Sequence, residues 1–383
     1  MAAERSGGYV KQGTGYRAFI PKPLPPDPTL SYDDRLLGLL SQADQAIGRL
    51  DAATELLPNP DLFVAMYVNK EATLSSQIEG TQASLTDVLE FQAGAARQGR
   101  PRDVREVVNY INAMNYGLNR LDSLPMSLRL IKEIHAELLK GVRGARQDPG
   151  EFRRSQNWIG PQGVTIVQAS FVPPPPQEVT RTMGELENYI HQESPLPALI
   201  KAGLVHAQFE TIHPFLDGNG RVGRLLITFL LCQWGILRKP LLYLSLFFKE
   251  HRQEYYDRLQ AVRDQGDWEG WLRFFLAGVA DISHRASLTA SSIQRLRNEH
   301  LSLVSQTAKG APLLEACFKL PYISITMAAK ELGTSFQTAR NTVYKFESLG
   351  LLREVTGDLR RRIYAYQPYL DLFETPVQPA TGS

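Results

Sequence analysis

The most informative sequence is His213-Pro-Phe-Leu-Asp-Gly-Asn-Gly-Arg-Val-Gly-Arg224, which lies between two apolar segments of helical periodicity. Gly218 and Gly220 permit backbone angles that side chains exclude, so successive N–H groups can point into one concavity. The helix that follows adds free N–H groups and the positive end of its dipole. Arg221 and Arg224 add planar donors that suit phosphate oxygens. The loop therefore predicts a polyphosphate site at a helix N-terminus.

The same loop also satisfies a dinucleotide-binding pattern by spacing alone. Gly218, Gly220 and Gly223 match G-x-G-x-x-G, but that pattern should follow a buried strand, whereas a helix precedes this loop. The acidic residue that the pattern needs about 20 positions later is missing as well. Arg238 and Lys239 stand there instead. The helical context therefore argues against dinucleotide binding.

A zinc site is a further interpretation of the residues just before the loop. His206, Glu210 and His213 share one helix face, and such a set can hold zinc. Pro214 follows His213 directly, however, and a residue before proline leaves helical angles. We therefore expect His213 to point away from the other two, and His206 to be a packed core histidine.

Composition bounds the class of protein. The chain has 383 residues, 43% of them hydrophobic and 21% charged, with a net charge of +2. This balance predicts a soluble protein of two or three domains without a strong overall field for nucleic acid or membrane. Cys232 and Cys317 are expected to be reduced thiols. No stretch reaches the roughly 18 apolar residues that span a bilayer, and the first residues lack the apolar core of a secretory signal, so we expect a cytoplasmic protein.

Periodicity predicts a mainly α chain. The predicted helices run from about Ser31 to Leu50 and over Leu62–Ile78, Asp103–Met114, Leu128–Leu139, Gln177–His191, Pro197–Ile212, Val222–Trp234, Leu246–Arg263 and Trp268–Arg285. The predicted regions are an extended N-terminal arm (1–30), a helical region (31–125), a central core (126–290), a linker (291–310), a C-terminal domain (311–372) and a tail (373–383).

One internal stretch, residues 157–172, has strand character. Gly160 and Gly163 mark a turn, and the run from Val164 to Val167 is β-branched. Four prolines follow at 173–176. The pattern predicts a β-hairpin closed by a stiff polyproline segment.

The string H-P-F-x-D-G-N-G-R-x-x-R is similar at every fixed position to the motif of the Fic family, and the resemblance extends over about Ser31 to Arg285. It implies a Fic helical bundle with a small β-hairpin flap. It also implies an enzyme that moves AMP from ATP to a Ser, Thr or Tyr hydroxyl of a target protein, with Mg²⁺ as cofactor.

The resemblance assigns roles residue by residue. His213 matches the general base, a task that suits histidine because its pKa lies near working pH. Phe215 matches the residue that anchors the loop, and Asp217 matches the Mg²⁺ ligand. Arg221 and Arg224 match the contacts to the β- and γ-phosphates. The implied nucleotide-binding residues are Gly218, Asn219, Gly220, Arg221, Val222, Gly223, Arg224, Tyr255 and Arg263.

Two of these assignments have an alternative that stays open. Tyr255, Tyr256 and Arg263 match the adenine side of the family site, but they equally fit core aromatics and a solvated arginine. The predicted hairpin falls where the family places its flap, which binds an extended target segment by strand addition. The flap residues set against nucleotide or target are Gln168, Ala169, Ser170 and Phe171, and an ordinary surface hairpin is the other interpretation.

A second motif, Ser75-Ser-Gln-Ile-Glu79-Gly80, is similar to the family's inhibitory helix in the class that carries it N-terminal to the catalytic loop. A Glu79 that paired bidentately with Arg224 would deny this arginine to the γ-phosphate. Some family members with this glutamate also remove AMP, so an inhibitory and a catalytic role for Glu79 both stay open. Self-modification and a homodimer are further open expectations.

The C-terminal domain resembles a winged helix. A helix over 325–332, a turn at Gly333-Thr334, a helix over 335–349 and two strands, 351–355 and 362–366, follow one another. Arg340 and Lys345 on the second helix, with Arg360, Arg361 and Arg362 at the hairpin, give local positive charge, and six basic residues face three acidic ones between Arg340 and Tyr366. DNA binding is one interpretation, and the modest excess of basic residues slightly favours a packing or protein-interaction module. A DNA-binding regulator with a nucleotide-sensing Fic module is thus the alternative to the AMP transferase.

Overall fold

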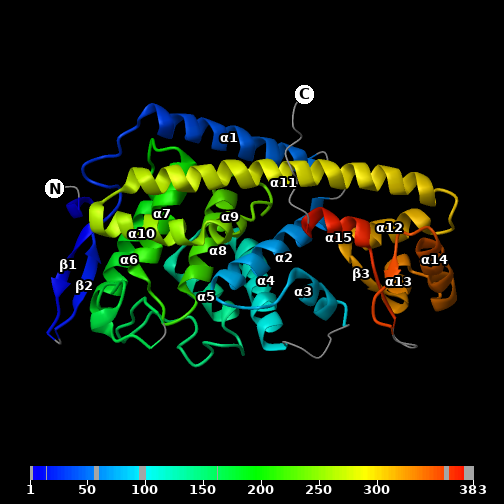
Figure 1. Ribbon diagram of the computed structural model, residues 1–383, viewed down its shortest axis with the longest axis horizontal. Coiled ribbons are helices and arrows are strands. Elements are labelled where there is room, and N and C mark those ends of the chain that lie inside the picture. The colour runs from blue at the N-terminus through cyan, green and yellow to red at the C-terminus, as the bar shows by residue number, and fades with distance from the viewer. Residues whose placement is uncertain are drawn as a thin grey trace.

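A computed structural model describes residues 3–13, 15–55, 60–94, 101–161, 163–357 and 362–374. The fold is mainly α-helical, as predicted. Figure 1 shows two long helices, α1 (Asp34–Glu55) and α11 (Trp268–Val304), side by side along one edge of the molecule. The remaining helices lie on one side of this pair, with most of the helices that follow α11 at one end and the first two strands at the other.

The predicted helices are present. After α1, the helices that precede α11 are α2 (Pro60–Ile78), α3 (Leu85–Gln92), α4 (Pro101–Leu121), α5 (Leu128–Leu138), α6 (Pro176–His191), α7 (Ala198–Ile212), α8 (Asn219–Gln233), α9 (Ser245–Glu250) and α10 (Arg252–Gln265). The segment Leu246–Arg263, predicted as one helix, is divided into α9 and α10 at His251. Helix α3 was not predicted; Ser84 and Asp87 form a capping box at its start.

Helix α7 carries no amphipathic pattern because it is buried on all sides, from Leu199 to Ile212. It ends at His213, whose left-handed backbone (φ 49°, ψ 60°) agrees with the expectation that the residue before Pro214 leaves the helix. Helix α8 begins after Gly218, which also has a left-handed backbone (φ 80°) that favours glycine. The two buried helices therefore fix both ends of the short loop between them.

The predicted linker at 291–310 is wrong over most of its length, because α11 continues as one helix of 37 residues to Val304. The polar stretch stays helical since one side of it packs against the C-terminal residues. His300 Nδ1 lies 2.6 Å from the Tyr366 hydroxyl, and Arg297 pairs with Glu315.

The predicted N-terminal arm folds into a hairpin of β1 (Gly7–Lys11) and β2 (Arg17–Pro21), after a short 3₁₀ turn over Ala3–Arg5. Phe19 N–H donates to Val172 O at 2.9 Å, so the arm is joined to the end of the predicted flap.

The predicted hairpin over 157–172 is largely wrong. A single antiparallel bridge joins Ile159 and Phe171, and a 3₁₀ turn over Ile166–Gln168 stands where the strand was expected. Thr165 donates its N–H and its hydroxyl to Gln168 Oε1, which turns the chain locally. Val167 is 74% exposed, so this β-branched run has no buried face of the kind that stabilises a strand.

The C-terminal module, residues 310–374, contains α12 (Gly310–Lys319), β3 (Tyr322–Ser324), α13 (Ile325–Leu332), α14 (Phe336–Ser348), β4 (Arg353–Glu354), β5 (Ile363–Ala365) and α15 (Gln367–Glu374). Its three strands pair in the order β3-β5-β4. Arg360 and Arg361 lie outside the described residues, as does the predicted tail beyond residue 374.

Helix α15 returns to the N-terminal region and packs on α2. The Phe373 ring meets the Tyr67 ring edge to face at 5.5 Å, and Lys70 Nζ donates to Phe373 O at 3.0 Å. Both cysteines are free thiols, Cys317 being buried and Cys232 half-buried. Among the described residues, no helix is long and apolar enough to cross a membrane.

We predict that Phe373→Ala lowers the free energy of unfolding by about 3–5 kcal/mol, because truncation of a buried phenylalanine leaves a cavity. Urea denaturation followed by circular dichroism measures this loss. The matched control is Phe336→Ala, since Phe336 is 55% exposed and should change stability by less than about 0.5 kcal/mol. Equal stability of the two variants would show that α15 does not depend on its contact with α2.

Candidate active site

The residue His213 is held in its left-handed conformation by a buried arginine from outside the motif. Arg153 Nε donates to His213 O at 2.9 Å, and Arg153 Nη2 donates to Pro174 O and, at 3.4 Å, to Ile212 O. One guanidinium thus ties the end of α7 to the segment that follows the predicted flap. Nothing in the sequence marked Arg153, because its partners are backbone carbonyls far away in the chain.

The loop is anchored in the core by Phe215, as predicted from the resemblance. Its ring is buried and stacks on His135 at a centroid distance of 3.7 Å. His135 Nδ1 accepts the Gly150 N–H at 2.8 Å, so Nε2 carries the proton and donates to Asp217 O at 3.0 Å. Burial lowers the pKa of His135 to about 4, which keeps the ring in this neutral form. His135, which lies on α5, is another residue that the motif did not reveal.

The amide of Asn219 closes the loop on itself and is not directed at a ligand. Its Oδ1 accepts from Phe215 N–H and its Nδ2 donates to Phe215 O, both at 2.8 Å. The side-chain amide of Asn219 is therefore occupied within the loop, and the contact of Asn219 with phosphates stays a prediction. Asp217 is half-buried, and its Oδ1 accepts from Gly218 N–H at 2.6 Å.

The guanidinium of Arg221 is buried and incompletely paired. The side chain is 1% exposed, and its Nη2 lies 3.3 Å from Asp217 Oδ1. Nη1 lies 3.9 Å from Glu106 Oε2, beyond hydrogen-bond distance, and neither Nε nor Nη1 has a hydrogen-bond partner among the residues that the structure describes. Buried donors without partners are rare because desolvation is not compensated. Arg221 therefore presents two donors that an anion could bind.

Arg224 is fully engaged by the C-terminal end of α2. It is 3% exposed; its Nε donates to Ser75 Oγ at 2.8 Å, and its Nη2 donates to Ser75 O at 3.0 Å and to Glu79 Oε1 at 2.8 Å. The predicted meeting of Glu79 with Arg224 is thus present, but the bidentate geometry is wrong because Ser75 binds Nε. Burial opposes the charge of Glu79, but Arg224 outweighs it and lowers the pKa of Glu79.

Gly220 leaves the space that this contact needs. A Cβ atom at Gly220 would lie 2.3 Å from Glu79 Oε1 and 3.0 Å from Arg224 Nη1. Any larger residue would collide with the carboxylate. The glycine of the loop and the glutamate of α2 therefore fit together as a pair.

The catalytic candidate His213 is 19% exposed and uncharged. Burial lowers the pKa of His213 to about 3, and the charges of Arg263 and Arg153 add to this effect. The nearest carboxylate, Glu210, is buried, and its Oε2 lies 4.0 Å from His213 Nδ1, too far for a hydrogen bond. Burial also raises the pKa of Glu210 to about 7.

The zinc interpretation is excluded by the partners of His206. Its Nδ1 lies 2.9 Å from Gly223 O and its Nε2 lies 2.9 Å from the Tyr255 hydroxyl, so His206 is a core histidine as expected. Among the described residues, no group of three or more His, Cys, Asp or Glu side chains could hold a metal.

Two of the three predicted adenine-side residues, Tyr255 and Arg263, are buried. Tyr255 is a buried core aromatic that binds His206, whereas its neighbour Tyr256 is exposed. Arg263 is buried; its Nη2 donates to Glu210 O at 3.2 Å, and its guanidinium lies 3.9 Å from the centre of the Phe171 ring. Arg263 therefore supports the end of α7 and the predicted flap, and is not the solvated arginine of the alternative interpretation.

The four predicted flap residues divide into two groups. Gln168 and Ser170 are exposed and Ala169 is half-buried. Phe171 is buried, and its ring centre lies 6.0 Å from that of Phe19 in β2. The N-terminal hairpin and Arg263 thus hold Phe171 in place, while the three residues before it face outward.

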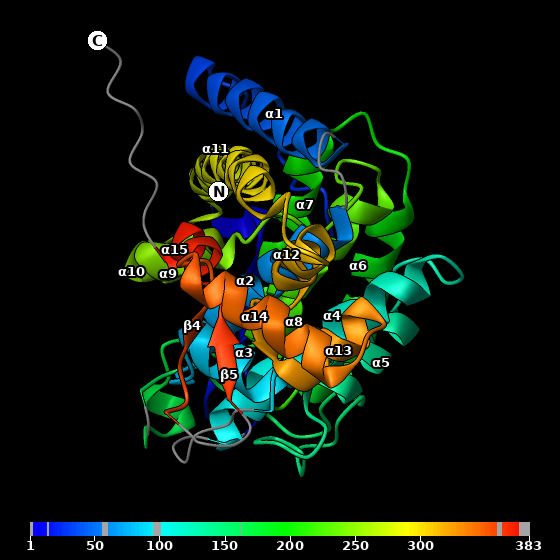
Figure 2. The same cartoon turned by 90° about the vertical axis from the view of Figure 1, so that its right-hand side faces the viewer.

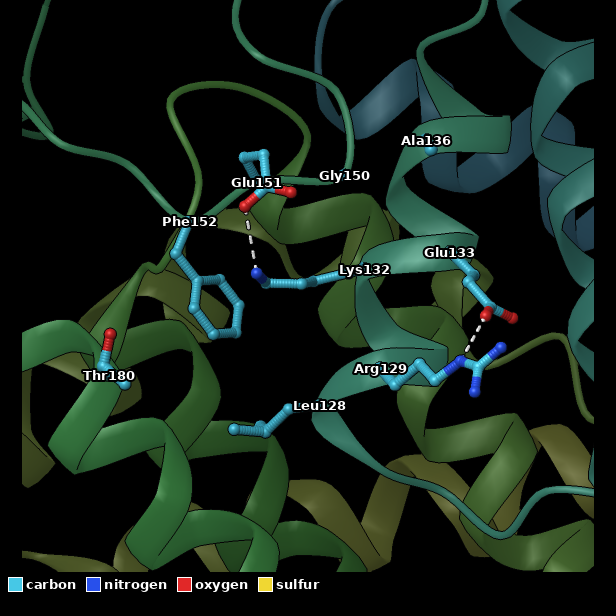
Figure 3. Close-up of a pocket in the computed structure, with 9 residues that line it drawn as sticks. All are labelled: Leu128, Arg129, Lys132, Glu133, Ala136, Gly150, Glu151, Phe152 and Thr180. Atoms are coloured by element: carbon cyan, nitrogen blue, oxygen red, sulfur yellow. Dashed lines mark hydrogen bonds and ion pairs between the residues drawn. The ribbon is translucent and has the colours of Figure 1, made fainter.

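A separate hollow lies between α5, the turn at residues 150–152 and α6 (Figure 3). The charged side chains that line this hollow form ion pairs with one another. Lys132 pairs with Glu151 at 3.0 Å, and Arg129 pairs with Glu133 at 2.9 Å. This hollow offers no unpaired group of the kind that Arg221 presents, so the loop remains the candidate site.

Two protein-family models match this chain. Residues 37–119 match the N-terminal model of the Fic/DOC family, and residues 125–231 match the Fic/DOC family model. Protein adenylyltransferase Fic of Aedes aegypti is 34% identical over 183 residues, which are 46% of this chain and 31% of that protein. A probable protein adenylyltransferase of Aquifex aeolicus is 33% identical over 178 residues, 45% of this chain and 50% of that protein. The chain thus spans about a third to a half of these curated relatives.

Solved structures show the same fold. A Fic family protein from Desulfovibrio desulfuricans G20 superposes with a TM-score of 0.57 at 22% identity, over 88% of this chain and 97% of that chain. A Fic domain containing signaling protein from Bacteroides thetaiotaomicron gives a TM-score of 0.51 at 18% identity, over 68% of this chain and 97% of that chain.

Proposed function

We propose, from the Fic/DOC N-terminal region and the Fic/DOC domain that this chain contains, that it transfers AMP from ATP to a hydroxyl side chain of a target protein. The observation that carries the proposal is the pair of donors on buried Arg221 that lack partners among the described residues, in the same sequence motif as His213. Phosphate oxygens would satisfy those donors, and a neutral histidine can accept a proton. The names of the curated relatives point to the same activity.

In the proposed reaction the target hydroxyl oxygen attacks the α-phosphorus of ATP. The new O–P bond forms as the bond to pyrophosphate breaks, and His213 takes the hydroxyl proton. Arg221 and, once released, Arg224 stabilise the negative charge that gathers on the leaving pyrophosphate. Arg153, which binds His213 O, keeps the base in position.

Asp217 fits a Mg²⁺ ion that arrives with the nucleotide. It is a half-buried carboxylate, and a hard cation binds carboxylate and phosphate oxygens together. The ion would neutralise charge between the phosphates.

Glu79 and Ser75 inhibit this reaction in our proposal. In the structure they take up the Nε and Nη2 donors of Arg224, which would otherwise bind the γ-phosphate. While Glu79 is bound to Arg224, ATP in the site would bind without the contact between this arginine and the γ-phosphate. The outward-facing residues Gln168, Ala169 and Ser170 would bind an extended target segment.

A nucleotide-sensing regulator is the alternative function. A sensor needs a phosphate site but no general base, and this chain retains both His213 and Asp217. Mass spectrometry of the purified protein after incubation with ATP and Mg²⁺ separates the two, because only a transferase adds AMP to itself or to a target.

We predict that Glu79→Gly raises AMP transfer about tenfold or more, because a charged hydrogen bond contributes about 1.5–3 kcal/mol and its loss frees Arg224. Incorporation of α-³²P-labelled AMP into protein measures the change. In the same background His213→Ala should abolish labelling, and Glu299→Gln on the exposed face of α11 should leave it unaltered. Labelling of wild type and Glu79→Gly to the same extent would contradict the inhibitory role.

We predict that Arg221→Ala, in the Glu79→Gly background, weakens ATP binding about tenfold or more, since a charge-assisted contact to phosphate is lost. Isothermal titration calorimetry with ATP and Mg²⁺ measures the affinity. Arg129→Ala removes a mostly exposed arginine and serves as the control. Unchanged affinity in Arg221→Ala would argue against the phosphate site.

We predict that His213 stays neutral from pH 8 down to pH 5, because burial holds its pKa near 3 and protonation sets in only as pH falls through that value. NMR of histidine-labelled protein follows the ring signals, and the His213→Ala spectrum assigns them. A midpoint near the ordinary histidine value of about 6.5 would show that the base is solvated.

A further inference from the structure

The outer face of α14 is uncovered and has an unusual composition. The inner face packs in the C-terminal module through Ala339, Thr342, Val343 and Phe346. The exposed positions fall one turn apart along the helix. They are Phe336, Gln337, Arg340, Asn341, Lys345, Glu347 and Ser348, with Tyr344 half-buried among them.

The exposed basic residues of this face are Arg340, in the second turn of the helix, and Lys345, in its last turn. Arg340 and Lys345 form no ion pair with a carboxylate in the described part of the chain. Arg340 lies over the Tyr344 ring at 5.1 Å, and Arg340 and then Arg362 lower the pKa of the Tyr344 phenol. Glu347, the one exposed carboxylate of α14, lies in its last turn.

Helices other than α14 pack the C-terminal module against the rest of the protein. Helix α12 packs on α2 and α11, and α15 packs on α11. Helix α14 packs on α12 and α13, and Figure 2, which views the molecule from the module's end, shows it in front. A role confined to packing therefore leaves the composition of the outer face of α14 unexplained.

We propose that this face of α14 enters the major groove of double-stranded DNA. Helices α13 and α14 meet at Gly333, whose left-handed backbone (φ 56°) makes the turn of a helix-turn-helix. The second helix of that motif is the one that reads DNA. With 13 residues α14 is about 20 Å long, and the groove is about 12 Å wide, enough to admit a helix.

The exposed side chains of the first two turns are those that read base edges. Arginine binds guanine O6 and N7 with two donors, and asparagine and glutamine bind adenine N6 and N7. Arg340, Asn341 and Gln337 are of these types, and Gln337 Nε2 already donates to Asn341 Oδ1 at 3.1 Å. An exposed phenylalanine, Phe336, suits the methyl group of thymine.

The test uses the full-length chain and a labelled random-sequence 24-base-pair duplex. Fluorescence anisotropy at 50 and 200 mM salt should show binding that weakens about tenfold or more at the higher salt, because phosphate contacts release counterions. Selection of bound duplexes from the pool should then enrich a preferred sequence. No binding at 50 mM salt, or a preference for single-stranded RNA of random sequence over the duplex, would overturn the proposal.

Variants separate base reading from general charge. On the selected duplex Arg340→Ala and Asn341→Ala should each weaken binding about tenfold, because one good pair of base contacts discriminates by about 1–3 kcal/mol. Arg340→Lys keeps the charge but loses the two-donor geometry, so it should keep the salt dependence and lose preference at one base pair. The matched control Arg295→Ala removes an exposed arginine of α11 and should leave binding within about twofold of wild type. Equal effects of Arg295→Ala and Arg340→Ala would refute a reading face on α14.

Discussion

The buried guanidinium of Arg224 is the group on which the arrangement of the site depends. A charge at this depth needs partners, because an unpaired buried ion is strongly destabilising. Ser75 and Glu79 are those partners in the structure, and both come from α2. The charge of buried Arg224 therefore helps to fix the position of the C-terminal end of α2.

Helix α2 is itself held by polar contacts deep in the core. Glu71 is buried and accepts from the Tyr110 hydroxyl at 3.2 Å and from Ser245 N–H at 3.1 Å. About one turn before Glu71, α2 receives Phe373 of α15 on Tyr67. The helix that meets Arg224 is thus packed between the core and the C-terminal module.

The loop itself is shaped by hydrogen bonds between side chains and backbone. Arg153 binds His213 O, His135 binds Asp217 O, and Asn219 binds both backbone groups of Phe215. These bonds fix the backbone of the loop without using the His213 ring or the Nε and Nη1 donors of Arg221. Preorganised donors of this kind need no rearrangement when charge develops on a substrate.

Much of this was predictable from local sequence, and the exceptions have physical causes. The loop, the end of α2 and most helices follow from glycine positions, proline and periodicity, which act over a few residues. Arg153 and His135 could not be found in that way, because their partners are carbonyls of residues about 60 to 80 positions away. Whether α11 continues past residue 290, and whether residues 164–167 form a strand, depends on the elements that pack against these segments. Periodicity of the sequence alone does not predict such packing.

The position of Glu79 on the same chain as Arg224 has a further consequence. In the proposed inhibition, this carboxylate competes with the nucleotide for Arg224 and acts at an effective concentration that is about millimolar even for a short flexible tether. That concentration does not change with the amount of protein. It is set by how firmly α2 is packed, and contacts remote from the loop, such as Glu71 with Ser245, contribute to that packing. Under the proposed inhibition, the nucleotide concentration needed to displace Glu79 therefore depends on the stability of the fold as well as on the affinity of the site.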